Sequence, residues 1–276
     1  MLNVSPKEQQ ADAHLLRFPS GRWALIDIAD AADAPGHVMR LLQRRRVQEL
    51  ELVVISHFHV DHYGRLVDLL EAGARVKRVA LNVPARTAAD REKPWGCDWD
   101  DVQRVLGLLR ERGVPYFTPK AGDVIFSEPL PDGGEVKLEV LCAYDGENTP
   151  VGRTDVNDTS IIVRLQHGNV RALFSGDLNF PLGKYLVESG GDLRADVLKA
   201  PHHGTESTAP DEFFAAVQAK AVLVPSPRAL WFSPRSKRVR EFYKERGVPT
   251  YVSGIHGHVT VEFERDSFRV TPQHRR

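Results

Sequence analysis

Cysteine is scarce in this chain of 276 residues, which has only Cys97 and Cys142. A disulfide framework or a four-cysteine zinc site needs more cysteines at closer spacing, so we exclude both and expect two reduced thiols. Net charge is also absent, because 37 Lys and Arg balance 37 Asp and Glu. A global attraction to nucleic acid or to an acidic surface is therefore not expected, and any such attraction must be local.

Long apolar runs are missing as well. No stretch of the sequence approaches the roughly 20 apolar residues of a membrane-spanning helix. The first residues lack the basic-then-apolar pattern of a signal peptide. We therefore expect a cytoplasmic protein with no membrane partner. Apolar residues still make up 42% of the chain, which is enough for a sizeable core.

Strand and helix patterns alternate along the chain. Leu50–Ser56 is rich in apolar and β-branched residues, with an unbroken apolar run at residues 52–55, as is typical of a buried strand. The stretch from Cys97 to Gly113 has helical spacing, with Asp98 as the expected N-cap and Gly113 as the stop. Hairpin turns are predicted at "PDGGE" and "QHGN". The absence of a linker predicts one α/β domain over residues 1–276, with two packed sheets and helices outside. A doubly wound parallel sheet is the rival architecture, and the hairpins argue against it.

Four side chains that can bind metal follow the buried strand: His57, His59, Asp61 and His62. Imidazole nitrogen and carboxylate oxygen are good ligands for zinc, manganese or iron. In an extended stretch His57 and His59 point the same way and can reach one ion. A helix beginning near Tyr63 would turn Asp61 and His62 toward a second ion. The alternative, a solvated polar loop, gives no reason to place these residues after a buried strand.

Two later strand ends can complete such a site. Asp177 follows "LFSG" and could bridge two cations, while His202 and His203 follow "VLKAP". Taken alone, each would be an ordinary turn or surface residue. Together with the first motif they predict two divalent ions, Zn²⁺ or Mn²⁺. The predicted ligands are His57, His59, Asp61, His62, Asp177 and His202, with the choice between His202 and His203 left open.

The order of these motifs resembles a known family. "HFHVDH" (residues 57–62) is similar to the HxHxDH signature of the metallo-β-lactamase superfamily. "NDTSIIVRL", "ALFSGDLN", "ADVLKAPHHGT" and "VPTYVSGIHGHVTVEF" resemble the soluble metallo-hydrolase domain attached to ComEC/Rec2 DNA-uptake channels, and its stand-alone relatives. The resemblance covers about residues 12–265. It implies a four-layer αββα sandwich, a dinuclear site and phosphodiester hydrolysis, often of nucleic acid. It also implies that Asp27 supports the metal loop.

Two positions depart from this family pattern. Many members place a histidine between HxHxDH and the bridging aspartate, where this chain has "TDVNDTS" and offers Asp158 among others. ComEC relatives commonly have Asn-x-Tyr-Gly-His-Pro where this chain has "RALWFSP", with Ser233 at the histidine position. His256 or His258 could supply a replacement ligand, although histidines at strand ends are often surface residues.

The implied chemistry is attack on phosphorus by a water activated between two ions. Asp61 would orient that water as well as bind metal. His203 would stabilise the transferring phosphoryl group or protonate the leaving oxygen. Lys199 is a candidate phosphate contact, and a solvated lysine at a strand end is the equal alternative.

A local excess of basic residues predicts a nucleic-acid face. Residues 227–246 hold seven Lys or Arg and two Glu. Arg228 and Arg235 would contact phosphates, and Trp231 would stack on a base. A basic helix that is merely solvated fits the same pattern.

Two other classes of function compete with a nuclease. One is a small-molecule hydrolase on the same metals, acting on cyclic nucleotides, lactones or thioesters. The other is a non-catalytic interaction protein with a decayed site, against which the retained metal motifs argue. A protein partner or a homo-oligomer is compatible with the sequence, which does not distinguish them.

Overall fold

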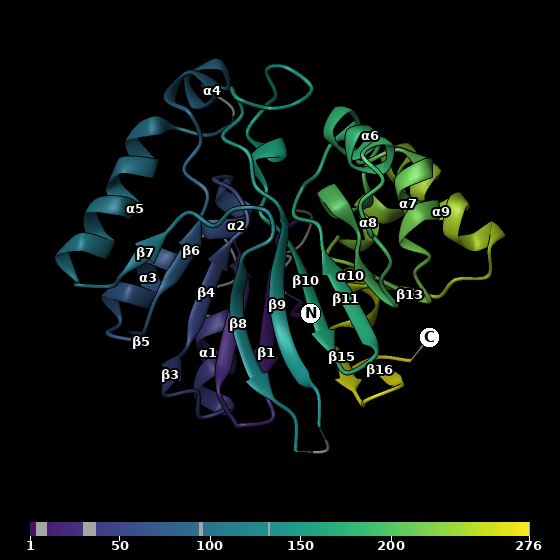
Figure 1. Ribbon diagram of the computed structural model, residues 1–276, viewed down its shortest axis with the longest axis horizontal. Coiled ribbons are helices and arrows are strands. Elements are labelled where there is room, and N and C mark those ends of the chain that lie inside the picture. Colours follow the sequence, from purple (N-terminus) through teal and green to yellow (C-terminus); the bar gives the residue numbers. More distant parts are fainter. Residues whose placement is uncertain (4–9, 30–36, 94–95, 132, 276) are drawn as a thin grey trace.

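The strands of the computed structural model form two main sheets that pack face to face (Figure 1). The structure describes residues 1–3, 10–29, 37–93, 96–131 and 133–275. The first sheet has the order β1 (Ala13–Arg17), β2 (Trp23–Ile28), β4 (Leu52–Ile55), β6 (Val79–Leu81), β7 (Tyr116–Phe117). The second has the order β14 (Thr250–Val252), β13 (Ala221–Val224), β12 (Val197–Lys199), β11 (Val170–Phe174), β10 (Ile162–His167), β9 (Glu135–Cys142), β8 (Val124–Pro129).

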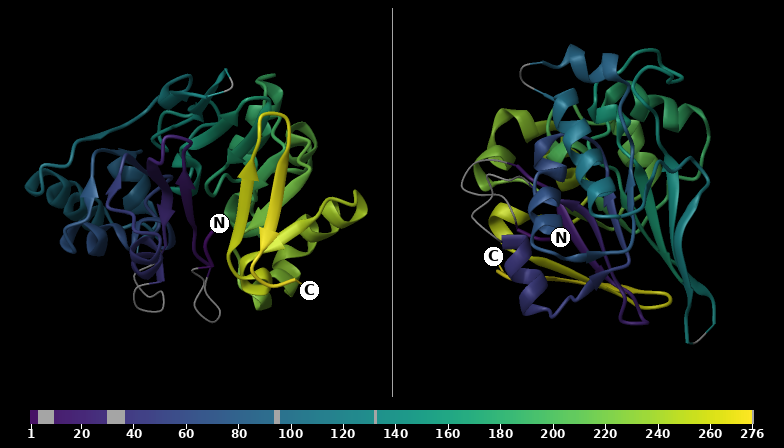
Figure 2. Two further views of the ribbon diagram at one scale, coloured as in Figure 1. Left: turned by 90° about the horizontal axis from the view of Figure 1, so that it is seen from below. Right: turned by 90° about the vertical axis from the view of Figure 1, so that its left-hand side faces the viewer.

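Helices cover the outer face of each sheet, and two small sheets lie at the periphery (Figures 1 and 2). In chain order the helices are α1 (His37–Arg44), α2 (Val60–Tyr63), α3 (Leu66–Glu71), α4 (Arg86–Arg91), α5 (Trp99–Glu111), α6 (Phe180–Glu188), α7 (Asp211–Val217), α8 (Arg228–Phe232), α9 (Lys237–Glu245) and α10 (Ser253–His256). Short 3-10 helices are η1 (Asn157–Thr159), η2 (Pro201–Gly204) and η3 (Pro234–Ser236). The small sheets pair β3 (Glu49–Leu50) with β5 (Arg75–Val76), and β15 (Val259–Phe263) with β16 (Phe268–Pro272).

Strand β4 shows why the sequence builds four layers. All four of its side chains are buried. Val53 and Ile55 join the core between the first sheet and its helices. Leu52 and Val54 point the opposite way, into the core between the two sheets. Since alternate residues of a strand face opposite sides, a continuous apolar run is required wherever both faces are covered.

The predicted αββα fold class is confirmed, and the doubly wound alternative is excluded by the two sheets and their antiparallel hairpins β8–β9 and β10–β11. The Asp98 carboxylate accepts a hydrogen bond from the amide of Asp100 at 2.9 Å, as an N-cap does, and Gly113 follows in the left-handed region. In the predicted turn "PDGGE", Asp132 lies outside the described residues. Within the part of the chain that is described, no helix is both long and apolar enough to cross a membrane.

The carboxyl ends of the central strands meet at one edge of the sandwich. β2 and β4 are parallel in the first sheet, and β11, β12 and β13 are parallel in the second. The predicted metal-binding residues follow β4, β11 and β12. The predicted helix near Tyr63 begins earlier, at Val60, so Asp61 and His62 lie in its first turn. The topology therefore brings segments more than 100 residues apart to one place.

Candidate metal centre

Four side chains from three segments form a compact group, the Asp177 cluster, in which three members are buried and Asp61 is half-buried: Asp61, His62, Asp177 and His203. Their ligand atoms all lie within 4.8 Å of one another. His203 Nε2 lies 3.1 Å from Asp61 Oδ2 and 3.1 Å from Asp177 Oδ2. His62 Nε2 lies 3.3 Å from Asp177 Oδ2. Asp177 thus contacts ligands from both sheets.

The two histidines of the Asp177 cluster are oriented by their other ring nitrogens. His62 Nδ1 lies 2.9 Å from Asp27 Oδ2, and His203 Nδ1 lies 3.0 Å from the carbonyl oxygen of Pro225. Both Nε2 atoms are buried and make no hydrogen bond within the described structure. A histidine whose Nδ1 is fixed by a partner, and whose Nε2 faces carboxylate oxygens that can share a cation with it, is how a protein presents a metal ligand. The Asp177 cluster therefore fits a divalent cation.

The charges within the Asp177 cluster also favour a bound cation. Burial lowers the pKa of His203, but Asp177 and Asp61 outweigh it and raise the pKa to about 9. Burial raises the pKa of Asp177, but His203, His62 and Lys199 hold it well below its usual range. Buried carboxylates that draw positive charge onto neighbouring imidazoles would be neutralised equally well by a bound cation.

A second group, the His57 cluster, consists of His57, His59 and Asn157. His57 Nε2 lies 3.1 Å from His59 Nδ1, which lies 3.0 Å from Asn157 Oδ1. The outer nitrogens are again held: His57 Nδ1 lies 3.1 Å from Ser56 Oγ, and His59 Nε2 lies 2.7 Å from Glu92 Oε2. The converging atoms are two imidazole nitrogens and one amide oxygen, a weaker donor set than that of the Asp177 cluster.

Glu92 was not predicted, although it ties three segments together. Besides His59, it accepts hydrogen bonds from the amides of Cys97 at 3.0 Å and Val156 at 2.7 Å. Burial lowers the pKa of His59, but Glu92 outweighs it and the pKa is raised. A single glutamate after a short helix carries no motif, so the sequence offered no signal for this contact.

His202 and His203 take different places because of the backbone between them. Both have positive φ, 46° and 53°, inside η2. His203 points into the Asp177 cluster and is fully buried. His202 Nδ1 pairs with Asn179 Oδ1 at 2.8 Å, and its Nε2 lies 4.0 Å from Asp177 Oδ2. The structure thus brings His203 into the cluster and leaves the predicted ligand His202 beside it.

Two aspartates near the clusters support loops. Asp27 accepts hydrogen bonds from the amide and the hydroxyl of Ser56, at 2.7 and 2.8 Å, and so braces the start of the metal loop. Asp158, a possible ligand from the sequence, accepts instead from the amide of Asn179 at 2.8 Å. Burial raises the pKa of Asp158 to about 7. Its carboxylate serves the loop after Asp177.

Lys199 cannot act as the predicted phosphate contact, because its side chain is only 1% exposed. Its ammonium lies 2.5 Å from Asp12 Oδ2 and 3.2 Å from Asp177 Oδ1, and donates to the carbonyl of Gly176 at 2.6 Å. Asp12 was not predicted either. The buried Lys199 and Asp12 lie beneath the Asp177 cluster, and Lys199 fixes the position of the Asp177 carboxylate.

The two C-terminal histidines make local contacts. His256 Nδ1 accepts a hydrogen bond from the amide of Val252 at 2.9 Å. His258 Nδ1 accepts from the amide of Asn3 at 3.0 Å. Neither is part of the Asp177 cluster or the His57 cluster as the described residues define them. The replacement ligand for the His57 cluster is therefore better sought at Asn157.

The predicted basic face borders the centre but presents a different aromatic ring. Trp231 is only 3% exposed and packs against the glycine that follows His203, so it cannot stack on a base. Its neighbour Phe232 is 56% exposed, with the guanidinium groups of Arg228 and Arg240 at 5.4 and 5.9 Å from its ring centre. Arg235 is half exposed and lies 3.5 Å from a glutamate, Glu206.

The fold carries two clusters of potential metal ligands at the carboxyl edge of its sheets. The chain belongs to the metallo-beta-lactamase superfamily, whose family model matches residues 6–226. It is similar to ComE operon protein 3 of Bacillus subtilis, with 24% identity over 183 residues. Those residues are 66% of this chain and 21% of that protein, so the chain matches about a fifth of its relative's length.

Solved structures share the fold. The metallo-beta-lactamase fold protein YhfI from Bacillus subtilis superposes with a TM-score of 0.56 at 12% identity, covering 91% of this chain and 94% of that one. CmlA, a diiron beta-hydroxylase from Streptomyces venezuelae, superposes with a TM-score of 0.53 at 14% identity, covering 97% and 55% of the two chains. At these identities the likeness establishes the architecture and leaves the reaction open.

Proposed function

We propose that this protein is a dinuclear metal-dependent hydrolase that cleaves phosphodiester bonds of nucleic acid. The observation that carries the proposal is the Asp177 cluster, in which two carboxylates and two oriented imidazole nitrogens converge within 4.8 Å. One ion would be held by Asp61, His62, Asp177 and His203. The other would be held by the His57 cluster together with Asp177, with Zn²⁺ or Mn²⁺ as the metal that this donor set suits.

Bound divalent cations would polarise a phosphoryl oxygen and lower the pKa of a water molecule. The protein's own residues supply position and proton transfer. Asp61 orients the water through its carboxylate, and Asp27 and Glu92 keep the ligand histidines in place. His202, anchored at Nδ1 by Asn179, delivers a proton from Nε2 to the leaving oxygen. The roles first predicted for His202 and His203 are thereby exchanged, because only His203 reaches the cluster.

The substrate class is supported by the face next to the centre. His203 is fixed by the carbonyl of Pro225, and α8 begins three residues later at Arg228. An exposed phenylalanine between two arginines offers a ring for stacking and positive charge for phosphates. The resemblance to the soluble domain of ComEC/Rec2 channels favours the same substrate. We keep Arg228 as a phosphate contact and assign the stacking role to Phe232 in place of Trp231.

A substrate panel tests this proposal. The purified protein is stripped of metal, reloaded with Mn²⁺ or Zn²⁺, and incubated with single-stranded DNA, duplex DNA, RNA, cyclic nucleotides, a lactone and a thioester. Cleavage of a nucleic acid that requires metal supports the proposal. Turnover of only the small substrates would replace it with a small-molecule hydrolase. Two tightly bound ions without any turnover would favour a non-catalytic interaction protein.

A further inference from the structure

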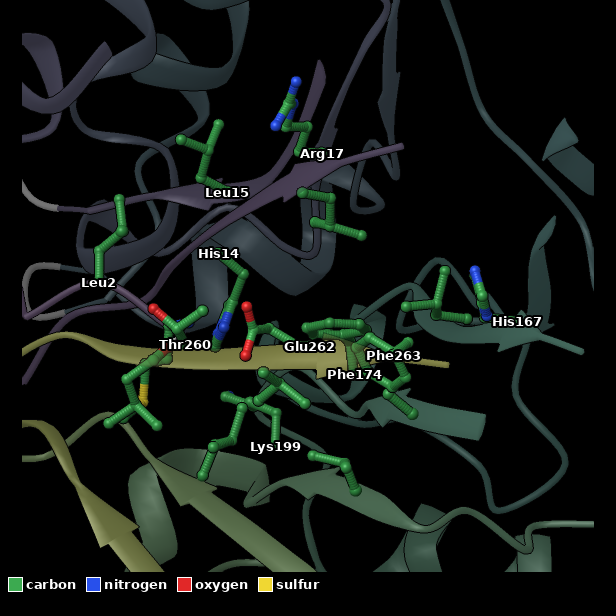
Figure 3. Close-up of a pocket in the computed structure, with 18 of the residues that line it drawn as sticks. Leu2, His14, Leu15, Arg17, His167, Phe174, Lys199, Thr260, Glu262 and Phe263 are labelled. Atoms are coloured by element: carbon green, nitrogen blue, oxygen red, sulfur yellow. Dashed lines mark hydrogen bonds between the residues drawn. The ribbon is translucent and has the colours of Figure 1, made fainter. Parts of the chain in front are cut away.

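A cavity that Lys199 helps to line contains none of the residues of the Asp177 cluster in its wall (Figure 3). Its volume is about 610 Å³, within the range of small-molecule sites. β1 and β15 form its walls, and β11, β12 and β13 contribute Phe174, Lys199 and Leu223. β1 pairs with β2 and β15 pairs with β16, so the two strands face each other across the cavity without forming a ladder in the described structure.

One buried polar side chain projects into this cavity without a hydrogen-bond partner among the described residues. His14 is 3% exposed, and neither of its ring nitrogens makes a hydrogen bond in the described structure. Its closest carboxylate oxygen, Asp12 Oδ1, is 3.9 Å away. Figure 3 shows the ring between β1 and β15, next to Phe174 and Lys199. Because an unsatisfied buried donor or acceptor costs about 1–3 kcal/mol, the position favours a ligand that supplies a polar group.

The rest of the lining defines what that ligand must be. Most of the remaining wall is apolar, including Phe174, Leu223 and Phe263. The charged groups at the exposed rim are Arg17, Arg45 and Glu262, two positive and one negative. The charge of Lys199 is already balanced by Asp12 and Asp177. An apolar body with a single negative charge fits this combination better than a polar or cationic molecule does.

We propose that the cavity is a binding site for an amphipathic carboxylate, such as a medium-chain fatty acid, with His14 donating a hydrogen bond to its polar group. The apolar chain packs against Phe174 and Leu223. The arginines lie at the exposed rim, apart from the buried His14, and favour an anionic ligand through their field without contacting its carboxylate. This site is separate from the metal centre and does not depend on the proposed hydrolysis. The buried Lys199 forms its boundary with the metal centre.

Decanoate is a suitable probe, with decanol as the uncharged comparison. Calorimetric titration of the full chain should show saturable binding of decanoate and at least tenfold weaker binding of decanol. Arg17→Glu combined with Arg45→Glu should weaken decanoate binding, whereas Glu262→Gln at the same rim should strengthen it. These three residues are exposed, so the variants should fold as the parent does. Equal affinity for both probes, or rim variants without effect, would overturn the proposal.

His14→Leu separates binding from a structural role. It removes the unsatisfied imidazole and keeps an apolar side chain of similar size, so the unliganded variant should unfold at a higher temperature than the parent. The same variant should bind decanoate several-fold more weakly. A variant that is less stable and binds decanoate with unchanged affinity would show that His14 serves the core alone, and the proposal would fall. Tighter binding of an extended apolar peptide than of decanoate would replace it with strand addition between β1 and β15.

Discussion

The Asp177 cluster and the His57 cluster lie side by side but are built from different chemistry. The Asp177 cluster brings two carboxylates and two imidazoles together, and Lys199 braces its shared aspartate from below. The His57 cluster has two imidazoles and the neutral amide of Asn157, and its nearby carboxylate, Glu92, contacts the outer nitrogen of His59. Two sites that differ by this much charge should bind the same cation with different affinities. We expect stepwise loading, with the Asp177 cluster filled first.

The largest effect should come from Asp177→Asn, because this residue is common to both proposed sites. The asparagine amide keeps the shape of the side chain but loses its charge, so both ions should be lost. Hydrolysis should then fall by more than about 100-fold, which is the largest loss usual for residues that only hydrogen-bond to a metal ligand. Elemental analysis and a nuclease assay check this. Asp90→Asn, on exposed α4, is the matched control and should keep two ions. Full activity of Asp177→Asn would contradict the proposal that Asp177 is a ligand of both metal sites.

His203→Ala and His202→Ala form the next pair. Loss of His203 removes a ligand from the Asp177 cluster, so one ion should be lost with most of the activity. Loss of His202 should leave both ions in place while kcat falls about 100-fold, as expected for a missing proton donor. Metal content separates the two variants even where their rates are similar. If instead His202→Ala releases metal, the ligand roles of the two histidines must be reversed.

Glu92→Gln tests the weaker site alone. Without the negative charge on the outer nitrogen of His59, affinity at the His57 cluster should fall by about 10- to 100-fold. The affinity of the Asp177 cluster should stay unchanged. Calorimetric titration with Mn²⁺ resolves the two steps. Glu147→Gln, whose parent side chain contacts Thr87 and Arg91, is the control for a lost glutamate charge. Equal weakening of both steps would show that the sites are not independent.

The smallest effect should be at the proposed nucleic-acid face, where neither metal step should change. Phe232→Ala should weaken binding by roughly 1–3 kcal/mol per stacked base without altering its salt dependence. Arg228→Ala should reduce the slope of the logarithm of the binding constant against the logarithm of the salt concentration by about the contribution of one phosphate contact. Binding is measured at several salt concentrations in the Asp177→Asn background to block turnover. Lys184→Ala, an exposed change on α6, is the control, and an identical loss there would reduce the face to nonspecific charge.

The sequence predicted the site residues that stand together in one motif and missed single residues that reach the site from elsewhere in the chain. Four potential metal ligands within six residues after a buried strand can be recognised because a strand end fixes where they point. Asp12 and Glu92 lie 165 and 85 residues from Asp177, and a single acidic residue has no pattern of its own. The packing of the two sheets brings Asp12 to Lys199, and the connections that follow two neighbouring strands of the first sheet bring Glu92 to His59.

The sequence does not show which of two neighbouring residues faces the site when both are of a suitable type, because the direction of each side chain decides this. Trp231 and Phe232 are consecutive in a helix and point about 100° apart, so one is buried and the other exposed. The choice between His202 and His203 depends on two positive φ angles that no residue type signals. Composition identifies such pairs, but the backbone between them decides which member faces the proposed site.

The left-handed backbone at the centre also carries a cost in stability. Asp27, His202 and His203 all have positive φ, where a side chain raises the conformational energy by roughly 1 kcal/mol or more relative to glycine. Glycine at position 202 would relieve that strain and should make the protein harder to unfold, while removing an imidazole beside the metal-binding residues. For the proposed metal centre, the most stable sequence of this loop is therefore not the one expected to be most active. Selection for stability alone would gradually erase the site and leave the sandwich intact.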